Sequence, residues 1–169
     1  MGPRAPQLHA RRARLRTLLR FDPATNAFRA SGRVPTTLPE HTATRLADGA
    51  VLLVGGAVAL RFDPARDRFD PLPASPRQGS AAVRLEDGRV LLVGGASPDA
   101  REVPAPAALF DPTRARFVPA ASPAVARRDF IAARLADGRV LIAGGYGLRG
   151  TPLASAELFD PATSPASPA

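Results

Sequence analysis

Seven aspartates stand in two recurring contexts where a carboxylate has the chemistry to bind a cation or accept a proton. They precede glycine at Asp48, Asp87 and Asp137, and lie within Phe-Asp-Pro at Asp22, Asp63, Asp111 and Asp160. An aspartate in either context also closes its own turn by accepting a backbone hydrogen bond. The acidic segment 63–71 lacks the ligand spacing and the glycine of a calcium-binding EF-hand loop. We therefore expect turns at these positions, with no metal site and no cofactor.

Histidine and thiol chemistry is nearly absent from the sequence. The chain has two histidines, His9 and His41, and no cysteine. A metal centre or a catalytic triad requires such side chains in a cluster with suitable partners. We therefore expect no catalytic residue and no enzyme activity, and a packing or hydrogen-bonding role for His41.

Three arginines recur at one fixed place, three residues before each Asp-Gly pair: Arg45, Arg84 and Arg134. One interpretation is a ring of positive charge presented by successive repeats. The other is a structural cation that holds a carboxylate or a carbonyl between repeats. Because the arginine is present in every copy, the pattern favours the structural role.

Residues that belong to a single copy are better candidates for binding. The long segments 96–106 and 146–154 differ from each other in sequence and length. Tyrosine and arginine are enriched at interaction hot spots. The candidate partner-binding residues are therefore Tyr146, Arg149, Arg101 and Glu102.

The elements that position these residues are set by a repeat. The sequence RLEDGRVLLVGG at 84–95 has near copies at 45–56 and 134–145. Phe-Asp-Pro occurs four times, and the first three copies are followed, seven residues after the first Phe, by Phe28, Phe69 and Phe117. Constant blocks with variable connections indicate structural units joined by tolerant loops.

Each unit is predicted to be a four-stranded antiparallel meander. In the middle copy we expect strands at 79–85, 89–95 and 106–111 and around 116–120, with a two-residue hairpin turn at Asp87–Gly88. A run that is apolar at every position predicts an inner strand buried on both faces. The predicted buried residues are Val90, Leu91, Leu92, Val93, Val140, Leu141, Phe62, Phe110 and Phe159.

The pattern resembles the bacterial form of the kelch repeat. The residues that carry the resemblance are the DGRVLLVGG segments, SAELFDPAT at 155–163, and the late aromatic of each early unit. Phe28, Phe69 and Phe117 stand where a tryptophan is usual, and the aromatic of the third strand is phenylalanine. The resemblance implies a β-propeller that acts as a protein-interaction module through loops at one rim. A carbohydrate-binding or carbohydrate-active propeller is the alternative, and a truncated fragment of a larger kelch protein is a third reading.

The number of repeats is low for a closed propeller. The chain reads as thirteen strands, an open or incomplete propeller of about three to four blades, whereas propellers typically have four to eight. Stacked repeats bury apolar faces against neighbours only, so each end keeps an apolar face. We therefore expect self-association through the end blades.

Composition limits the remaining predictions about domain boundaries, partners and localisation. The repeats are expected at 18–163, with an arginine-rich segment at 1–17 that is partly strand or disordered, and a disordered tail at 164–169. The net charge is +8, and aromatic residues make up 5% of the chain, too few stacking platforms to favour a nucleic-acid partner. No apolar run is long enough to span a membrane. Without a recognisable secretory signal, the default localisation is cytoplasmic, or secreted or cell-surface if the chain is part of a longer protein.

Overall fold

The structure is a computed structural model that describes residues 17–73, 77–97 and 104–163. Over these residues the chain is all-β, with four antiparallel sheets of two to four strands and no closed barrel. This arrangement confirms the predicted fold class, an incomplete propeller-like fold built from antiparallel meanders. The predicted tail 164–169 and nearly all of segment 1–17 lie outside the described residues.

Contacts divide the chain into two units, Met1–Thr37 and Leu38–Ala169. In the first unit, β1 (Thr17–Asp22) pairs with β2 (Ala27–Arg33) as an antiparallel hairpin. Phe21 lies opposite Phe28 in this hairpin, and the centres of their rings are 5.2 Å apart. The hairpin thus has the third and fourth strands of a repeat.

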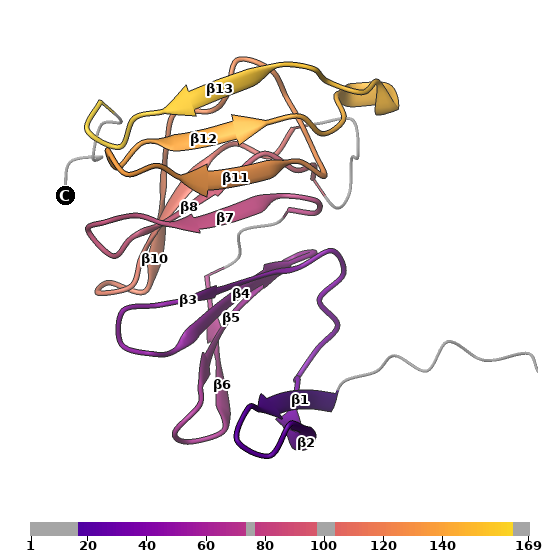
Figure 1. The fold of residues 1–169 in the computed structure, drawn as a ribbon, viewed down its shortest axis with the longest axis vertical. Helices are drawn as coiled ribbons and strands as arrows, with labels where there is room; N and C mark the ends of the chain where they lie inside the picture. Colours follow the sequence, from indigo (N-terminus) through magenta and orange to yellow (C-terminus); the bar gives the residue numbers. More distant parts are fainter. Residues whose placement is uncertain (1–16, 74–76, 98–103, 164–169) are drawn as a thin grey trace, which may run out of the picture. The chain divides into compact units, whose positions relative to one another are not determined.

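The second unit contains three consecutive meanders (Figure 1). The first sheet comprises β3 (Thr42–Arg45), β4 (Val51–Gly55), β5 (Val58–Asp63) and β6 (Arg68–Leu72). The second comprises β7 (Ala81–Arg84), β8 (Val90–Val93), β9 (Ala108–Asp111) and β10 (Arg116–Pro119). The third comprises β11 (Ile131–Arg134), β12 (Val140–Ala143) and β13 (Ala156–Phe159). A short 3-10 helix, η1 (Leu148–Gly150), precedes β13 and was not predicted.

The Asp-Gly hairpins have three-residue loops, so the predicted two-residue turn is wrong in length. The Leu85 amide donates to the Arg89 carbonyl at 2.8 Å, and the Gly88 amide donates to the Leu85 carbonyl at 3.2 Å. Gly88 has a φ of 88°, which places it in the left-handed region. This geometry is a turn followed by a glycine bulge, and the same bonds recur in the other two copies. The positive φ of Gly88 is the conformation that such a glycine turn requires.

Gly88→Ala should lower the free energy of unfolding by about 1 kcal/mol, because alanine is strained at this φ. A Cβ at Gly88 would meet no atom within 4 Å, so the loss comes from the backbone alone. Urea unfolding followed by circular dichroism measures it. Glu86→Ala, in the same loop at negative φ, is the control and should change stability by less than about 0.5 kcal/mol. If the two substitutions change the unfolding free energy equally, a side chain at position 88 causes no backbone strain.

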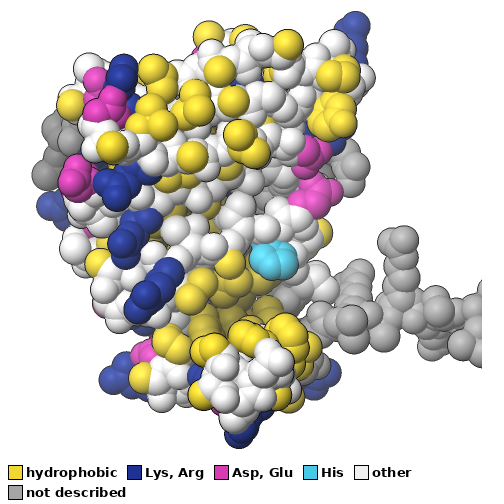
Figure 2. All heavy atoms as spheres, in the orientation of Figure 1, with side chains coloured by type: hydrophobic (Ala, Val, Ile, Leu, Met, Phe, Trp, Pro, Cys, Tyr) yellow, Lys and Arg dark blue, Asp and Glu magenta, His cyan; other side chains and the backbone are white. Residues whose placement is uncertain are grey.

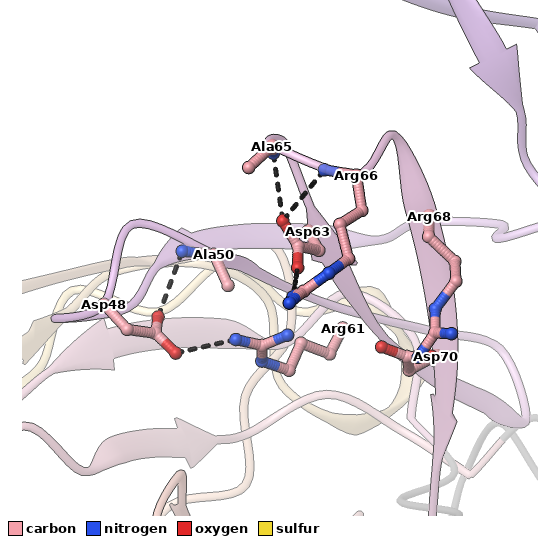
Figure 3. A network of polar contacts seen from close by, with 8 residues as sticks. All are labelled: Asp48, Ala50, Arg61, Asp63, Ala65, Arg66, Arg68 and Asp70. Carbon is pink, nitrogen blue, oxygen red and sulfur yellow. Dashed lines mark hydrogen bonds and ion pairs between the residues drawn. The ribbon is translucent and has the colours of Figure 1, made fainter.

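The aspartates of both motifs close turns, as predicted. In the hairpin, Asp48 Oδ1 accepts from the Ala50 amide at 3.0 Å, and its other oxygen pairs with Arg61 at 2.7 Å. In Phe-Asp-Pro, Asp63 Oδ1 accepts from the amides two and three residues on, as Figure 3 shows. The hydrogen bond from Arg61 lowers the pKa of Asp48, and that from Arg66 lowers the pKa of Asp63. These carboxylates are therefore occupied by their own turns.

The turn after each early Phe-Asp-Pro ends on a left-handed residue, and one of these residues is unsuited to that conformation. Asn26, Asp67 and Ala115 occupy equivalent places with φ of 49°, 50° and 49°. Asparagine and aspartate tolerate this region, whereas alanine does so at a steric cost. Ala115 is therefore the strained member of the set.

Ala115→Asn should raise the free energy of unfolding by about 0.5–1 kcal/mol, because asparagine accepts the left-handed backbone. Thermal and urea unfolding of the two proteins measure the gain. Ala65→Asn is the matched control, since Ala65 is an exposed alanine in the equivalent turn of another repeat, without a positive φ. A gain at position 65 as large as that at position 115 would argue against relief of strain.

The second sheet lies between the other two sheets of this unit and is buried on both faces. Val90 and Leu92 pack against the first sheet, whereas Leu91 and Val93 pack against the third. All four side chains of β8 are fully buried, which confirms the predicted inner strand. The predicted burial of Val140, Phe62, Phe110 and Phe159 is confirmed as well.

Leu141 is the exception among the predicted core residues, since it is only half-buried. It lies opposite Ala133 and Leu158 in the third sheet, on the face that points away from the second sheet. Leu91, its counterpart in β8, is covered by the third sheet, and no further described sheet of the second unit covers Leu141. The burial predicted for Leu141 is therefore wrong.

The seven-residue spacing of the phenylalanines follows from strand register. Phe62 lies opposite Phe69, and Phe110 lies opposite Phe117, across the last two strands of their sheets. The ring centres are 4.8 and 5.0 Å apart, a favourable distance for tilted aromatic pairs. Each pair ties the outer strand to the rest of its sheet.

Candidate functional site

Arg127 is a buried cation that joins two strands of the third sheet to the segment before β11. Its Nη1 donates to the carbonyls of Gly144 and Ser155 at 3.0 and 3.1 Å. Its Nη2 donates to the Glu157 carboxylate at 2.8 Å. Glu157 also accepts from the amides of Ala124 and Val125. This network anchors one wall of the pocket described below.

The pKa of Glu157 reflects this network. Burial raises the pKa of the carboxyl group, but the hydrogen bonds from Arg127 and from the two amides outweigh it, so the pKa lies below its ordinary value of 4.5. A depressed pKa means that the unfolded chain binds more protons in acid. The stabilisation is therefore complete above pH 4.5 and is lost as the pH falls through the folded-state pKa.

We expect the difference in unfolding free energy between the wild-type chain and Arg127→Ala to shrink as the pH is lowered from 6 to 3. Protonated Glu157 carries no charge, so it no longer forms an ion pair with Arg127. Urea unfolding at a series of pH values measures it. Asp48, Asp63, Asp111 and Asp137 also have lowered pKa values, but they are present in both proteins and cancel in the difference. A difference that stays constant with pH would contradict this coupling.

Arg77 is the counterpart of Arg127 in the second sheet, but it has no equivalent carboxylate. It is buried, and its Nη2 donates to the carbonyl of Pro106 at 2.9 Å. Its Nε and Nη1 are buried without a hydrogen-bond partner among the described residues. Ala108 stands where the third sheet has Glu157. Desolvation consequently lowers the pKa of Arg77 to about 10.

Of the three arginines predicted to be structural, the described chain shows a contact with a carboxylate of another repeat for Arg134 alone. Arg45, Arg84 and Arg134 are exposed at the hairpin ends of β3, β7 and β11. Arg134 lies 4.0 Å from Glu86 of the neighbouring hairpin, and no ion pair is seen for Arg45 or Arg84 within the described segments. Basic side chains form a line along this face in Figure 2. Arg134 thus contacts a carboxylate of the neighbouring repeat, as the structural interpretation expected, whereas Arg45 and Arg84 show no such contact within the described segments and match the other interpretation, a row of positive charge.

The sequence did contain a signal for the buried pair. Arg77 and Arg127 each stand ten residues before the aspartate of the following hairpin. The first repeat has Leu38 at this position, so the arginine recurs in only two copies. That incomplete recurrence concealed the structural role.

A pocket of about 410 Å³ lies where the segment before β11 meets the loop after β12. The predicted residues Tyr146 and Arg149 both line it, together with Arg128, Asp129, Gln78 and Glu40, among others. The other two predicted residues, Arg101 and Glu102, lie outside the described residues. The structure therefore brings together the two predicted residues that it describes, and it adds Arg128, which was not predicted.

Tyr146 is held by Arg128 through both backbone and side chain. The amide of each residue donates to the carbonyl of the other at 2.9 Å. The Arg128 guanidinium lies 5.7 Å from the centre of the Tyr146 ring, within the range of a cation–π contact. Arg128 also pairs with Asp129 at 2.6 Å. Tyr146 stays 44% exposed, so its side chain is positioned but accessible.

Arg149 reaches the pocket from a strained backbone. Its φ is 68°, which is costly for a residue with a side chain, and such strain clusters at binding and switch sites. The loop is closed by the Gly147 amide, which donates to the Thr151 carbonyl at 2.8 Å, and by the Gly150 amide, which donates to the Gly147 carbonyl. No carboxylate of the described chain forms an ion pair with Arg149.

No family model and no curated protein matches this chain. Its function has to be inferred from its own residues.

Other chemistry has little support in the part of the chain that the structure describes. No three His, Asp or Glu side chains there are grouped so as to hold a metal ion. His41 Nδ1 lies 2.9 Å from the Leu38 carbonyl, the hydrogen-bonding role that was expected. No described helix is long and apolar enough to cross a membrane. The pocket at Tyr146 is therefore the leading candidate site.

Proposed function

We propose that this chain is a non-enzymatic kelch-type interaction module that binds a protein segment in the pocket at Tyr146. The observation that carries the proposal is that an accessible tyrosine, whose ring lies against Arg128, lines one pocket together with Arg149. Aromatic and arginine side chains at the centre of a pocket are the residues that supply most binding energy in protein interfaces.

The polar groups of the pocket favour an extended peptide as the ligand. On the wall of the pocket, the Gln78 amide can both donate and accept hydrogen bonds and the Asp129 carboxylate can accept them, and Arg149 has a planar guanidinium that suits a carboxylate. A peptide with an aromatic or aliphatic side chain over Tyr146 and an acidic side chain at Arg149 satisfies both features. The repeat resemblance supports the same class, because kelch-type blades hold variable loops at one rim.

The non-enzymatic part of the proposal rests on the residue types. The chain lacks cysteine, and His9 and His41 are far apart in the sequence. The aspartates with lowered pKa values are engaged in turns or ion pairs and so have little capacity as bases near neutral pH. Binding is therefore the function that these residues support best.

Selection of a phage-displayed random peptide library on the immobilised full-length chain tests the proposal. Peptides that are enriched should bind the purified protein in fluorescence polarisation, and Tyr146→Ala and Arg149→Ala should each weaken binding about tenfold, equivalent to about 1.4 kcal/mol. Arg116→Ala is the matched control, because Arg116 is an exposed arginine of β10 that does not line the pocket. Enriched peptides that bind all four proteins equally, or no enrichment, would refute the proposal.

The same proteins on a glycan array examine the carbohydrate alternative. Tyr146 lies in one pocket with the carboxylates of Asp129 and Glu40, the combination of ring and acid that sugar binding requires. Glycan binding that is lost in Tyr146→Ala, without peptide binding, would replace the peptide proposal by this alternative.

A further inference from the structure

The outward face of the third sheet is composed entirely of apolar side chains. Cross-strand register places two rows on this face, each running over β11, β12 and β13: Ile131, Ala143 and Ala156, and then Ala133, Leu141 and Leu158. Ile131 is 67% exposed and Leu158 is 50% exposed. Hydrophobic side chains are seen over this part of the molecule in Figure 2. The outer face of a repeat that is left to solvent is normally polar, and this face is apolar.

The equivalent face of the second sheet packs against a neighbouring sheet. Its six equivalent residues are Ala81, Val83, Leu91, Val93, Ala107 and Leu109. All six pack in one cluster with the third sheet, where Val140, Ile142 and Phe159 cover them. Sequence and position thus match a face that elsewhere in this chain is closed by the next sheet.

The covering residues also recur. Val90, Leu92 and Phe110 of the second sheet cover the first sheet, as Val140, Ile142 and Phe159 cover the second. The equivalent set in the first sheet is Val51, Leu53 and Phe62. It belongs to neither of the two clusters between sheets, and Val51 and Leu53 are only half-buried, although Phe62 is buried and pairs with Phe69.

One apolar face and one covering set therefore remain unmatched within the second unit, at its last and first sheets. We propose that a second copy of this chain covers the outward face of the third sheet with the Val51, Leu53 and Phe62 side of its first sheet. The contact repeats the packing that already occurs twice within the chain. Two copies contribute six described sheets of three or four strands, a number within the range of closed propellers.

Leu158→Arg combined with Ile131→Arg gives a direct test, because both side chains are exposed on this face and both arginines can stay in solvent in a single chain. Leu158→Arg alone is too mild, since Arg61 occupies the equivalent place in the first sheet, which the second sheet nevertheless covers. Light scattering after size-exclusion chromatography should give the wild-type chain, at micromolar concentration, at least twice the 17.6 kDa of one chain. The variant with both arginines should give the mass of one chain with an unchanged circular dichroism spectrum.

Val125→Arg is the control, because Val125 is partly exposed and lies outside this face. It should keep the wild-type mass. A wild-type chain that is monomeric throughout the micromolar range would overturn the proposal, and so would an assembly that Leu158→Arg and Ile131→Arg leave intact.

If the variant with arginine at positions 131 and 158 does not fold, cross-linking tests the proposal instead. The chain has no cysteine, so single introduced thiols are unique. Ile131→Cys and Leu53→Cys, mixed in equal amounts and treated with a short bismaleimide, should form a mixed dimer far faster than either variant alone. A mixture that cross-links no faster than the separate variants would refute the head-to-tail contact.

Discussion

Arg127→Ala should lower the free energy of unfolding by about 3–5 kcal/mol, the typical cost of breaking a buried ion pair by removing one partner. The substitution removes the guanidinium donor of the Gly144 carbonyl and leaves Glu157 without its cation. The Ser155 carbonyl also loses a donor but keeps the hydrogen bond from the Gly144 amide. An acceptor that loses its partner away from water carries a desolvation penalty. Urea unfolding at pH 7 measures the loss of unfolding free energy, with the slope of free energy against urea concentration fitted separately for each protein.

Arg77→Ala is the matched control for this prediction. Arg77 is equally buried, but it has one hydrogen bond to a carbonyl and no carboxylate partner within the described residues. Arg77→Ala creates a cavity, but it also removes a buried charge that lacks an ion-pair partner. The free energy of unfolding should therefore fall clearly less than in Arg127→Ala. If the two variants lose the same stability, the ion pair with Glu157 contributes nothing and the cost is packing alone.

Phe110→Ala should also cost about 3–5 kcal/mol, since it removes a large side chain from a closed site. Phe110 is 1% exposed and packs with Val90 and Leu92 against the first sheet. Its ring pairs with that of Phe117, and the loss of this contact adds to the cavity. The midpoint of urea unfolding should fall without a change in slope.

Phe28→Ala is the matched control, because it makes the same substitution at an exposed position. Phe28 belongs to the same motif and has the same ring pairing with Phe21, but it is 69% exposed. Its replacement should change the unfolding free energy by no more than about 1 kcal/mol. A loss as large as that of Phe110→Ala would mean that the aromatic pair, rather than burial between sheets, provides the stability.

Features that depend on a few neighbouring residues could be predicted from the sequence. Asp-Gly and Asp-Pro specify turns because the aspartate accepts backbone hydrogen bonds within its own loop. The seven-residue spacing of Phe110 and Phe117 predicts their pairing, because turn length sets strand register. Tyr146 and Arg149 were selected as candidates because they belong to a single copy of the repeat, and both line the pocket. The length of the hairpin loop was missed, because Asp-Gly occurs in both two- and three-residue turns.

Burial between sheets was decided by the tertiary structure. Leu91 and Leu141 occupy the same place in near-identical segments, yet one is fully buried and the other is not, because only the second sheet has a neighbour on that side. Arg127 is buried and Arg134 is exposed for the same reason, since burial depends on what packs across from each residue. The pocket likewise joins Gln78 of one repeat to Tyr146 of the next. Local sequence determines strands and turns, whereas the contacts that create a core and a site form between segments far apart in the chain.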